Sequence, residues 1–176
     1  MSDDEAGRIY VGPTTLYALG QVGELDLLGS FDGRIVVPDI VRDQVTTEPA
    51  RTAVAEFLED TDVSDAVPER SRERATDVLG IEEGTHEAAM VAGVLAHSDP
   101  DDRTAVAVVS EDRRVRRLTE GLGGAVTSSF GVVARAAADD KYLSRSQARR
   151  IVRRLDAHGI QMTGEMRSQA VGAVSE

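Results

Sequence analysis

Short apolar runs alternate along most of the chain with amphipathic stretches and turn residues. The runs are residues 9–11, 33–37, 105–109 and 125–127. They are rich in β-branched residues and are bounded by Gly, Pro and polar residues, which is typical of strands. The run 105–109 contains no polar residue, and this predicts a central strand that is covered on both faces.

Stretches with helical spacing follow the predicted strands. The expected helices cover residues 14–19, 25–28, 38–45, 49–58, 70–79, 86–95, 113–120, 130–138, 144–158 and 163–174. Residues 60–69 are turn-rich and acidic, with a short edge strand expected around Val63. The alternation predicts an α/β fold, a three-layer α/β/α sandwich with a mainly parallel central sheet and a C-terminal helical pair.

The length of 176 residues is consistent with one compact core. We expect a disordered N-terminus at residues 1–7, a main domain at 8–140 and a helical extension at 141–176 that packs on the same domain. The chain has no cysteine, its first residues are acidic, and it contains no apolar run of membrane-spanning length. These features argue against disulfides, a secretory signal and a membrane span, so a cytoplasmic location is predicted.

The charge is strongly acidic, with 20 Lys and Arg against 31 Asp and Glu and a formal net charge of −11. Lys141 is the only lysine. Such a composition resembles that of proteins from salt-loving archaea. Because molar salt shortens the Debye length to ~3 Å, the net charge does not exclude binding to nucleic acid.

Four blocks of the sequence resemble the successive blocks of a PIN domain, the metal-dependent ribonuclease fold of the VapC-type toxins and their relatives. The blocks are residues 9–19, 35–45, 84–89 and 108–116. The resemblance covers most of the chain and implies a cluster of carboxylates at the carboxyl edge of the sheet. In the family this cluster holds Mg²⁺ or Mn²⁺, which activates a water molecule.

The resemblance implies four acidic positions, of which this chain keeps two. The first and second positions fall on Gly12 and Gln44, and the third and fourth fall on Glu87 and Asp112. Loss of two negative ligands should weaken Mg²⁺ binding greatly, because Mg²⁺ depends on carboxylates. We therefore predict a degenerate site without a cofactor, with Mg²⁺ or Mn²⁺ bound only if the site is active.

Two alternatives remain open at this site. Asp39, Asp43 or Glu111 could substitute for the lost acids. Alternatively, Glu87 and Asp112 could be ordinary helix-start acids, favoured by the positive end of the helix dipole. The pair His86-Glu87 begins like an HExxH zinc motif, but Met90 stands where the second histidine is needed, so a zinc protease is not expected.

Arginines cluster on two predicted helices, Arg113, Arg114, Arg116 and Arg117 on one and Arg145, Arg149, Arg150, Arg153 and Arg154 on the other. Spacings of three and four residues place several of them on a common face. They could contact phosphate, with Arg113, Arg116 and Arg117 as the nucleic-acid-binding candidates. They could equally pair with the abundant acids.

The leading functional hypothesis is a PIN-family protein with a degenerate nuclease site, which acts as a non-catalytic nucleic-acid-associated or protein-binding regulatory module. The first alternative is an active Mg²⁺/Mn²⁺-dependent endoribonuclease of the VapC toxin type that uses Glu87 and Asp112. The second alternative is a structural dimerisation module. The resemblance implies RNA, an antitoxin-like protein and a second copy of the chain as partners.

Overall fold

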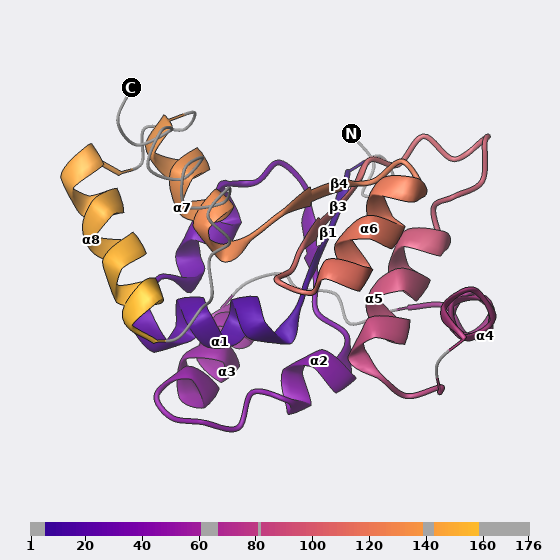
Figure 1. Ribbon diagram of the computed structural model, residues 1–176, viewed down its shortest axis with the longest axis horizontal. Coiled ribbons are helices and arrows are strands. Elements are labelled where there is room, and N and C mark those ends of the chain that lie inside the picture. Colours follow the sequence, from indigo (N-terminus) through magenta and orange to yellow (C-terminus); the bar gives the residue numbers. More distant parts are fainter. Residues whose placement is uncertain (1–5, 61–66, 81, 139–142, 159–176) are drawn as a thin grey trace.

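The structure, a computed structural model, describes residues 6–60, 67–80, 82–138 and 143–158. Its centre is a sheet of four parallel strands in the order β2-β1-β3-β4 (Figure 1). The strands are β1 (Arg8–Val11), β2 (Arg34–Val36), β3 (Val106–Val109) and β4 (Ala125–Thr127). All four predicted strands are confirmed, and β3 lies inside the sheet as expected.

Helices cover both faces of the sheet, which confirms the three-layer α/β/α fold (Figure 1). One layer holds α1 (Pro13–Val22), the 3-10 helix η1 (Leu25–Ser30), α3 (Ala50–Asp60), α7 (Ser129–Ala138) and α8 (Arg145–Ala157). The other layer holds α4 (Glu69–Leu79), α5 (His86–Leu95) and α6 (Arg113–Gly121). The short helix α2 (Asp39–Asp43) lies near the carboxyl end of the sheet and contacts both α1 and α5.

Helix α5 packs directly on β1 because its inner face consists of small residues. Ala88, Ala92 and Gly93 are buried. A Cβ atom at Gly93 would lie only 2.2 Å from Cε1 of Tyr10, a residue of β1 that is itself buried. This contact sets how closely α5 packs against β1. It therefore also sets where the first turn of α5 lies relative to the carboxyl edge of the sheet.

The same packing makes stability sensitive to alkaline pH. Burial raises the pKa of Tyr10 to about 12, and the nearby Arg8 opposes this only in part. The unfolded chain loses the phenolic proton near pH 10 whereas the folded chain keeps it, so stability is full below pH 10 and falls between pH 10 and 12. The expected loss from this group is ~3 kcal/mol. Urea titrations at pH 9 and 11.5 should show ~2 kcal/mol of this loss, and Tyr10→Phe should remove most of it. An equal loss in both proteins would contradict the assignment.

Three sequence-based predictions fall wholly or partly outside the described residues. They are the disordered N-terminus, the edge strand around Val63 and the second helix of the C-terminal pair. The first helix of that pair is α8, which begins with a capping box formed by Ser144 and Gln147. Within the described ranges, no helix is both long enough and apolar enough to cross a bilayer.

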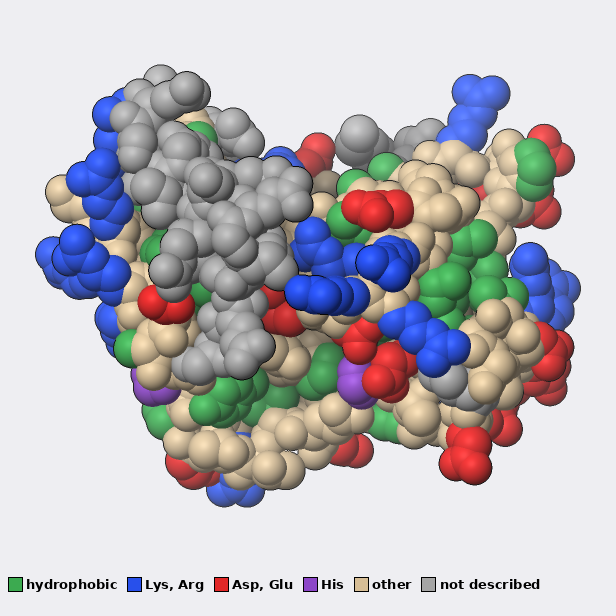
Figure 2. Space-filling model, viewed as in Figure 1, with side chains coloured by type: hydrophobic (Ala, Val, Ile, Leu, Met, Phe, Trp, Pro, Cys, Tyr) green, Lys and Arg blue, Asp and Glu red, His purple; other side chains and the backbone are tan. Residues whose placement is uncertain are grey.

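Positive side chains gather along α8 and over α6 (Figure 2). On the face drawn in Figure 2, Lys and Arg side chains gather over α6, beside a histidine and several acidic side chains. Among the arginines of α6, Arg113 and Arg117 are exposed and Arg116 is half-buried. The positive patch therefore borders the carboxyl edge of the sheet, where the expected site lies.

Candidate functional site

The carboxyl edge of the sheet brings the beginnings of several helices together. β1 ends at Val11 and leads through Gly12 into α1, while β3 ends at Val109 and leads through Ser110 to Asp112 into α6. Gly12 N–H donates to the carbonyl oxygen of Val109 at 2.9 Å, which ties the two strand ends together. In open parallel sheets this edge is where ligands bind.

Helix capping places the two retained acids. Thr85 Oγ1 accepts from Ala88 N–H at 3.2 Å and starts α5, so that Glu87 lies in its first turn. Asp112 is the N-cap of α6, and its Oδ1 accepts from the backbone N–H groups of Arg114 and Val115 at 2.8 and 2.9 Å. Asp112 is therefore a capping residue, as one alternative expected, and it also faces the sheet edge.

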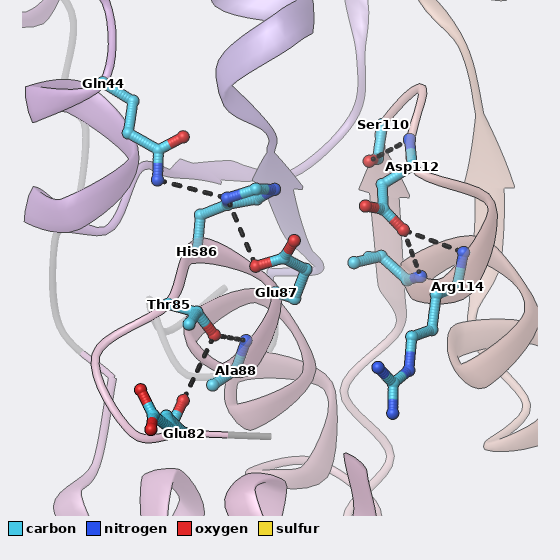
Figure 3. Close-up of polar contacts among 10 residues, drawn as sticks. Gln44, Glu82, Thr85, His86, Glu87, Ala88, Ser110, Asp112 and Arg114 are labelled. Atoms are coloured by element: carbon cyan, nitrogen blue, oxygen red, sulfur yellow. Dashed lines mark hydrogen bonds and ion pairs between the residues drawn. The ribbon is translucent and has the colours of Figure 1, made fainter. Parts of the chain in front are cut away.

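The structure brings Glu87 and Asp112 together with His86 (Figure 3). One potential ligand atom from each of the three side chains lies within 4.8 Å of the others, and all three residues are partly buried. His86 Nδ1 is 3.3 Å from Glu87 Oε2. Figure 3 shows the carboxylates of Glu87 and Asp112 facing one another from α5 and from the loop that precedes α6.

The two positions without acids differ in how they border this cluster. Gln44 is the C-cap of α2, and its Nε2 lies 3.1 Å from His86 Nδ1 (Figure 3). Position 44 thus reaches the cluster, but with a neutral amide. Gly12 is the N-cap of α1 and gives that helix no side-chain cap. A Cβ at this position would lie 3.3 Å from Ser110 Oγ, so a side chain here would border Ser110 and Asp112.

The three candidate substitutes for the missing acids are engaged elsewhere. Asp39 and Asp43 both contact Arg42, at 2.9 and 3.5 Å. Glu111 Oε1 accepts from both the backbone N–H and the hydroxyl of Ser129 at the start of α7. None of the three belongs to the metal-ligating group found among the described residues. The site therefore keeps two carboxylates and gains none of these three.

The arginines of α6 bond to backbone oxygens or extend into solvent. Arg116 Nη1 donates to the carbonyl oxygen of Ser110 at 3.2 Å, and Arg114 donates to the carbonyl oxygen of Leu79. Arg113 and Arg117 are exposed. In the part of the chain that the structure describes, the arginines of α6 make no ion pair with an acid, so pairing with acids is not the arrangement found on this helix.

His86 is the member of the cluster that sequence reasoning missed. Its only sequence interpretation was as the start of an HExxH motif, which Met90 rules out. The signal that could have identified it is its place beside Glu87 in the first turn of a helix that begins at the sheet edge. Two neighbouring residues in such a turn can both face the same edge.

Comparison with known protein families gives a family model for the PIN domain that matches residues 11–176. The chain belongs to the PIN-domain family. Neither the search of curated proteins nor the search of solved structures gave a match. PIN domains are nuclease-like proteins that generally use Mg²⁺ or Mn²⁺ and commonly bind RNA and partner proteins.

The donor set of this PIN domain does not fit Mg²⁺. Mg²⁺ requires oxygen ligands in near-octahedral geometry and relies on carboxylates to replace its water. Here the cluster offers two carboxylates, and Asp112 offers only its Oδ2, because its Oδ1 accepts two backbone hydrogen bonds. The remaining groups are an imidazole and an amide. These residues therefore offer Mg²⁺ fewer acidic ligands than the four that the family resemblance implies.

Proposed function

We propose that this PIN domain binds RNA through the phosphate backbone at the carboxyl edge of the sheet and does not cleave it with Mg²⁺. One observation carries the proposal. The N-terminus of α1 has glycine where the family has an acid, and it lies at the same sheet edge as arginines that have no acid partners among the described residues. The edge has lost acids that would favour Mg²⁺ and is therefore better suited to accept phosphate.

Electrostatics at position 12 support this proposal. The first turn of a helix carries unpaired N–H groups and about half a positive charge, which favour a phosphate group. An aspartate at position 12 would satisfy those groups and repel phosphate in the absence of a metal. Gly12 does neither, because it provides no side-chain cap.

The positions of the α6 arginines support the same conclusion. Arg113 and Arg117 are one helical turn apart and exposed, and Arg116 is held against the Ser110 carbonyl beside the cluster. A guanidinium group presents a planar fork of donors that matches phosphate. Aromatic residues are only 3% of the chain, so base stacking contributes little and binding should be tolerant of sequence.

Arg113→Ala/Arg117→Ala is expected to weaken binding of a labelled single-stranded RNA in EDTA by ~10-fold at low salt. The slope of log K against log[KCl] should fall by ~1.4, because each lost phosphate contact on a single strand removes ~0.7. Fluorescence anisotropy over a KCl series measures both quantities.

The matched control is Arg149→Ala/Arg153→Ala on α8, which has the same spacing and exposure on a helix that packs against α1 and α7. The proposal predicts no more than a small change in this control. An equal loss of RNA affinity in the two variants would indicate nonspecific attraction between RNA and surface arginines, which contradicts the proposal. Unchanged RNA affinity in the α6 variant would also contradict it. An antitoxin-like partner and a homodimer stay predictions from the family.

A further inference from the structure

The cluster at the sheet edge differs from the four acids that the family resemblance implies, both in its charge and in the type of its ligand groups. It contains an imidazole, that of His86, beside the carboxylates of Glu87 and Asp112. We propose that these three side chains bind a transition-metal ion, with Zn²⁺ as the preferred occupant, and discriminate against Mg²⁺. The proposal concerns metal selectivity and does not depend on RNA binding.

The geometry brings the three groups close to coordination distance. Bonds of about 2.1 Å to a tetrahedral ion place ligand atoms ~3.4 Å apart. The ligand atoms here lie within 4.8 Å of one another, and His86 Nδ1 and Glu87 Oε2 are already 3.3 Å apart. His86 and Glu87 are only partly buried, which leaves their side chains room to rotate towards Asp112.

Helix caps and packing hold the backbone that carries the three side chains. His86 and Glu87 lie in the first turn of α5, which Thr85 caps and whose small residues pack on β1. Asp112 is fixed by its own cap bonds and by the hydroxyl of Ser110, which accepts from its backbone N–H at 3.0 Å. Asp112 uses Oδ1 for both cap bonds, which leaves Oδ2 as the oxygen available to a metal.

The ligand types decide which ion is preferred. Imidazole suits Zn²⁺ and other late divalent ions, whereas Mg²⁺ prefers oxygen ligands and retains its water. One imidazole with two carboxylates gives three protein ligands, the number found in zinc sites that keep one position for water. Gln44 Nε2 lies 3.1 Å from the same Nδ1, so its amide must turn away when that nitrogen binds a metal.

The test uses the full chain, freed of metal, in calorimetric titrations with Zn²⁺ and separately with Mg²⁺. Zn²⁺ is expected to bind in a 1:1 ratio and at least ~100-fold more tightly than Mg²⁺. His86→Ala should lower the Zn²⁺ affinity by ~100-fold and leave the weak Mg²⁺ affinity unchanged. With Co²⁺ as the probe, the visible absorption band of the wild type should be altered or lost in the same variant.

His97→Ala is the matched control. His97 also pairs with a carboxylate, its Nδ1 lying 2.9 Å from Asp102 Oδ2, but no third ligand joins this pair among the described residues. Zn²⁺ binding should therefore be unchanged in this control. Circular dichroism, with His86→Gln as a second variant, separates loss of a ligand from loss of the fold.

Three outcomes would overturn the proposal. They are absence of 1:1 Zn²⁺ binding, equal affinity for Mg²⁺, or Zn²⁺ binding that His86→Ala leaves intact. RNA binding in EDTA is measured separately, so its failure would contradict the proposed function and leave the metal site standing. Conversely, Arg113→Ala/Arg117→Ala should retain the wild-type Zn²⁺ affinity.

Discussion

Gly12→Asp/Gln44→Glu is expected to raise the affinity for Mn²⁺ by at least ~100-fold, because two carboxylates join the two already present. Metal-dependent cleavage of RNA should appear together with metal binding. The metal would then have the set of acids that the family uses to activate water at this edge.

The backbone can accept both substitutions. Gly12 has φ −81° and ψ 165°, an extended conformation that any residue adopts. Its Cβ would lie 3.3 Å from Ser110 Oγ, so that hydroxyl must shift by a few tenths of an ångström. Aspartate is also a favourable N-cap for α1. The side chain of residue 44 already extends to His86, so a glutamate there reaches the cluster without a change in α2.

The matched control for this prediction is Gly12→Asn, which adds a side chain of similar shape without charge. Calorimetric Mn²⁺ titration and a gel assay of labelled RNA should show little gain for this control. The double variant should also bind RNA more weakly than the wild type in EDTA, since the added carboxylates repel phosphate. If the double variant neither binds Mn²⁺ more tightly nor cleaves RNA, the family's acid positions have been assigned wrongly.

Gly93→Ala is expected to lower the free energy of unfolding by ~3 kcal/mol, at the upper end of typical overpacking costs. The new Cβ would lie 2.2 Å from Cε1 and 2.5 Å from Cζ of Tyr10, far inside contact distance. The Tyr10 ring is buried, so it cannot move away without displacing its neighbours. Alanine is the better helix former by ~1 kcal/mol, and the clash must exceed that gain.

Urea denaturation followed by circular dichroism measures this effect. Gly121→Ala is the matched control, because Gly121 also lies in a helix but has nothing within 4 Å of an added Cβ. That control should be as stable as the wild type or more so. Adding Tyr10→Leu should recover part of the stability lost by Gly93→Ala. A Gly93→Ala protein with wild-type stability would show that α5 does not lie so close to β1.

The sequence was sufficient to predict most of the fold because local signals and tertiary packing agree. The apolar run 105–109 became the internal strand β3, and the helix predicted at residues 86–95 begins and ends at those residues. Its small residues predicted close packing on the sheet, and the contact between Gly93 and Tyr10 confirms it. The remaining differences in element boundaries are of one or a few residues.

The composition of the site could be predicted only in part. The positions of Glu87 and Asp112 followed from the family resemblance, and the structure brings both to one cluster. The participation of His86 depends on the approach of Gln44 and Asp112, which come from distant parts of the sequence. Likewise, the bonds of Glu111 to Ser129 depend on where α7 begins relative to β3. No local pattern encodes such distances.

We propose above that this PIN domain binds RNA without a metal ion and does not cleave RNA with Mg²⁺. The most direct measurement incubates the wild type with labelled single-stranded RNA in EDTA, in Mg²⁺ and in Mn²⁺, and records binding and cleavage in the same samples. We expect the wild type to bind RNA in EDTA and, in both metals, to cleave it no more than Glu87→Gln does. Metal-dependent cleavage that Asp112→Asn abolishes would contradict it.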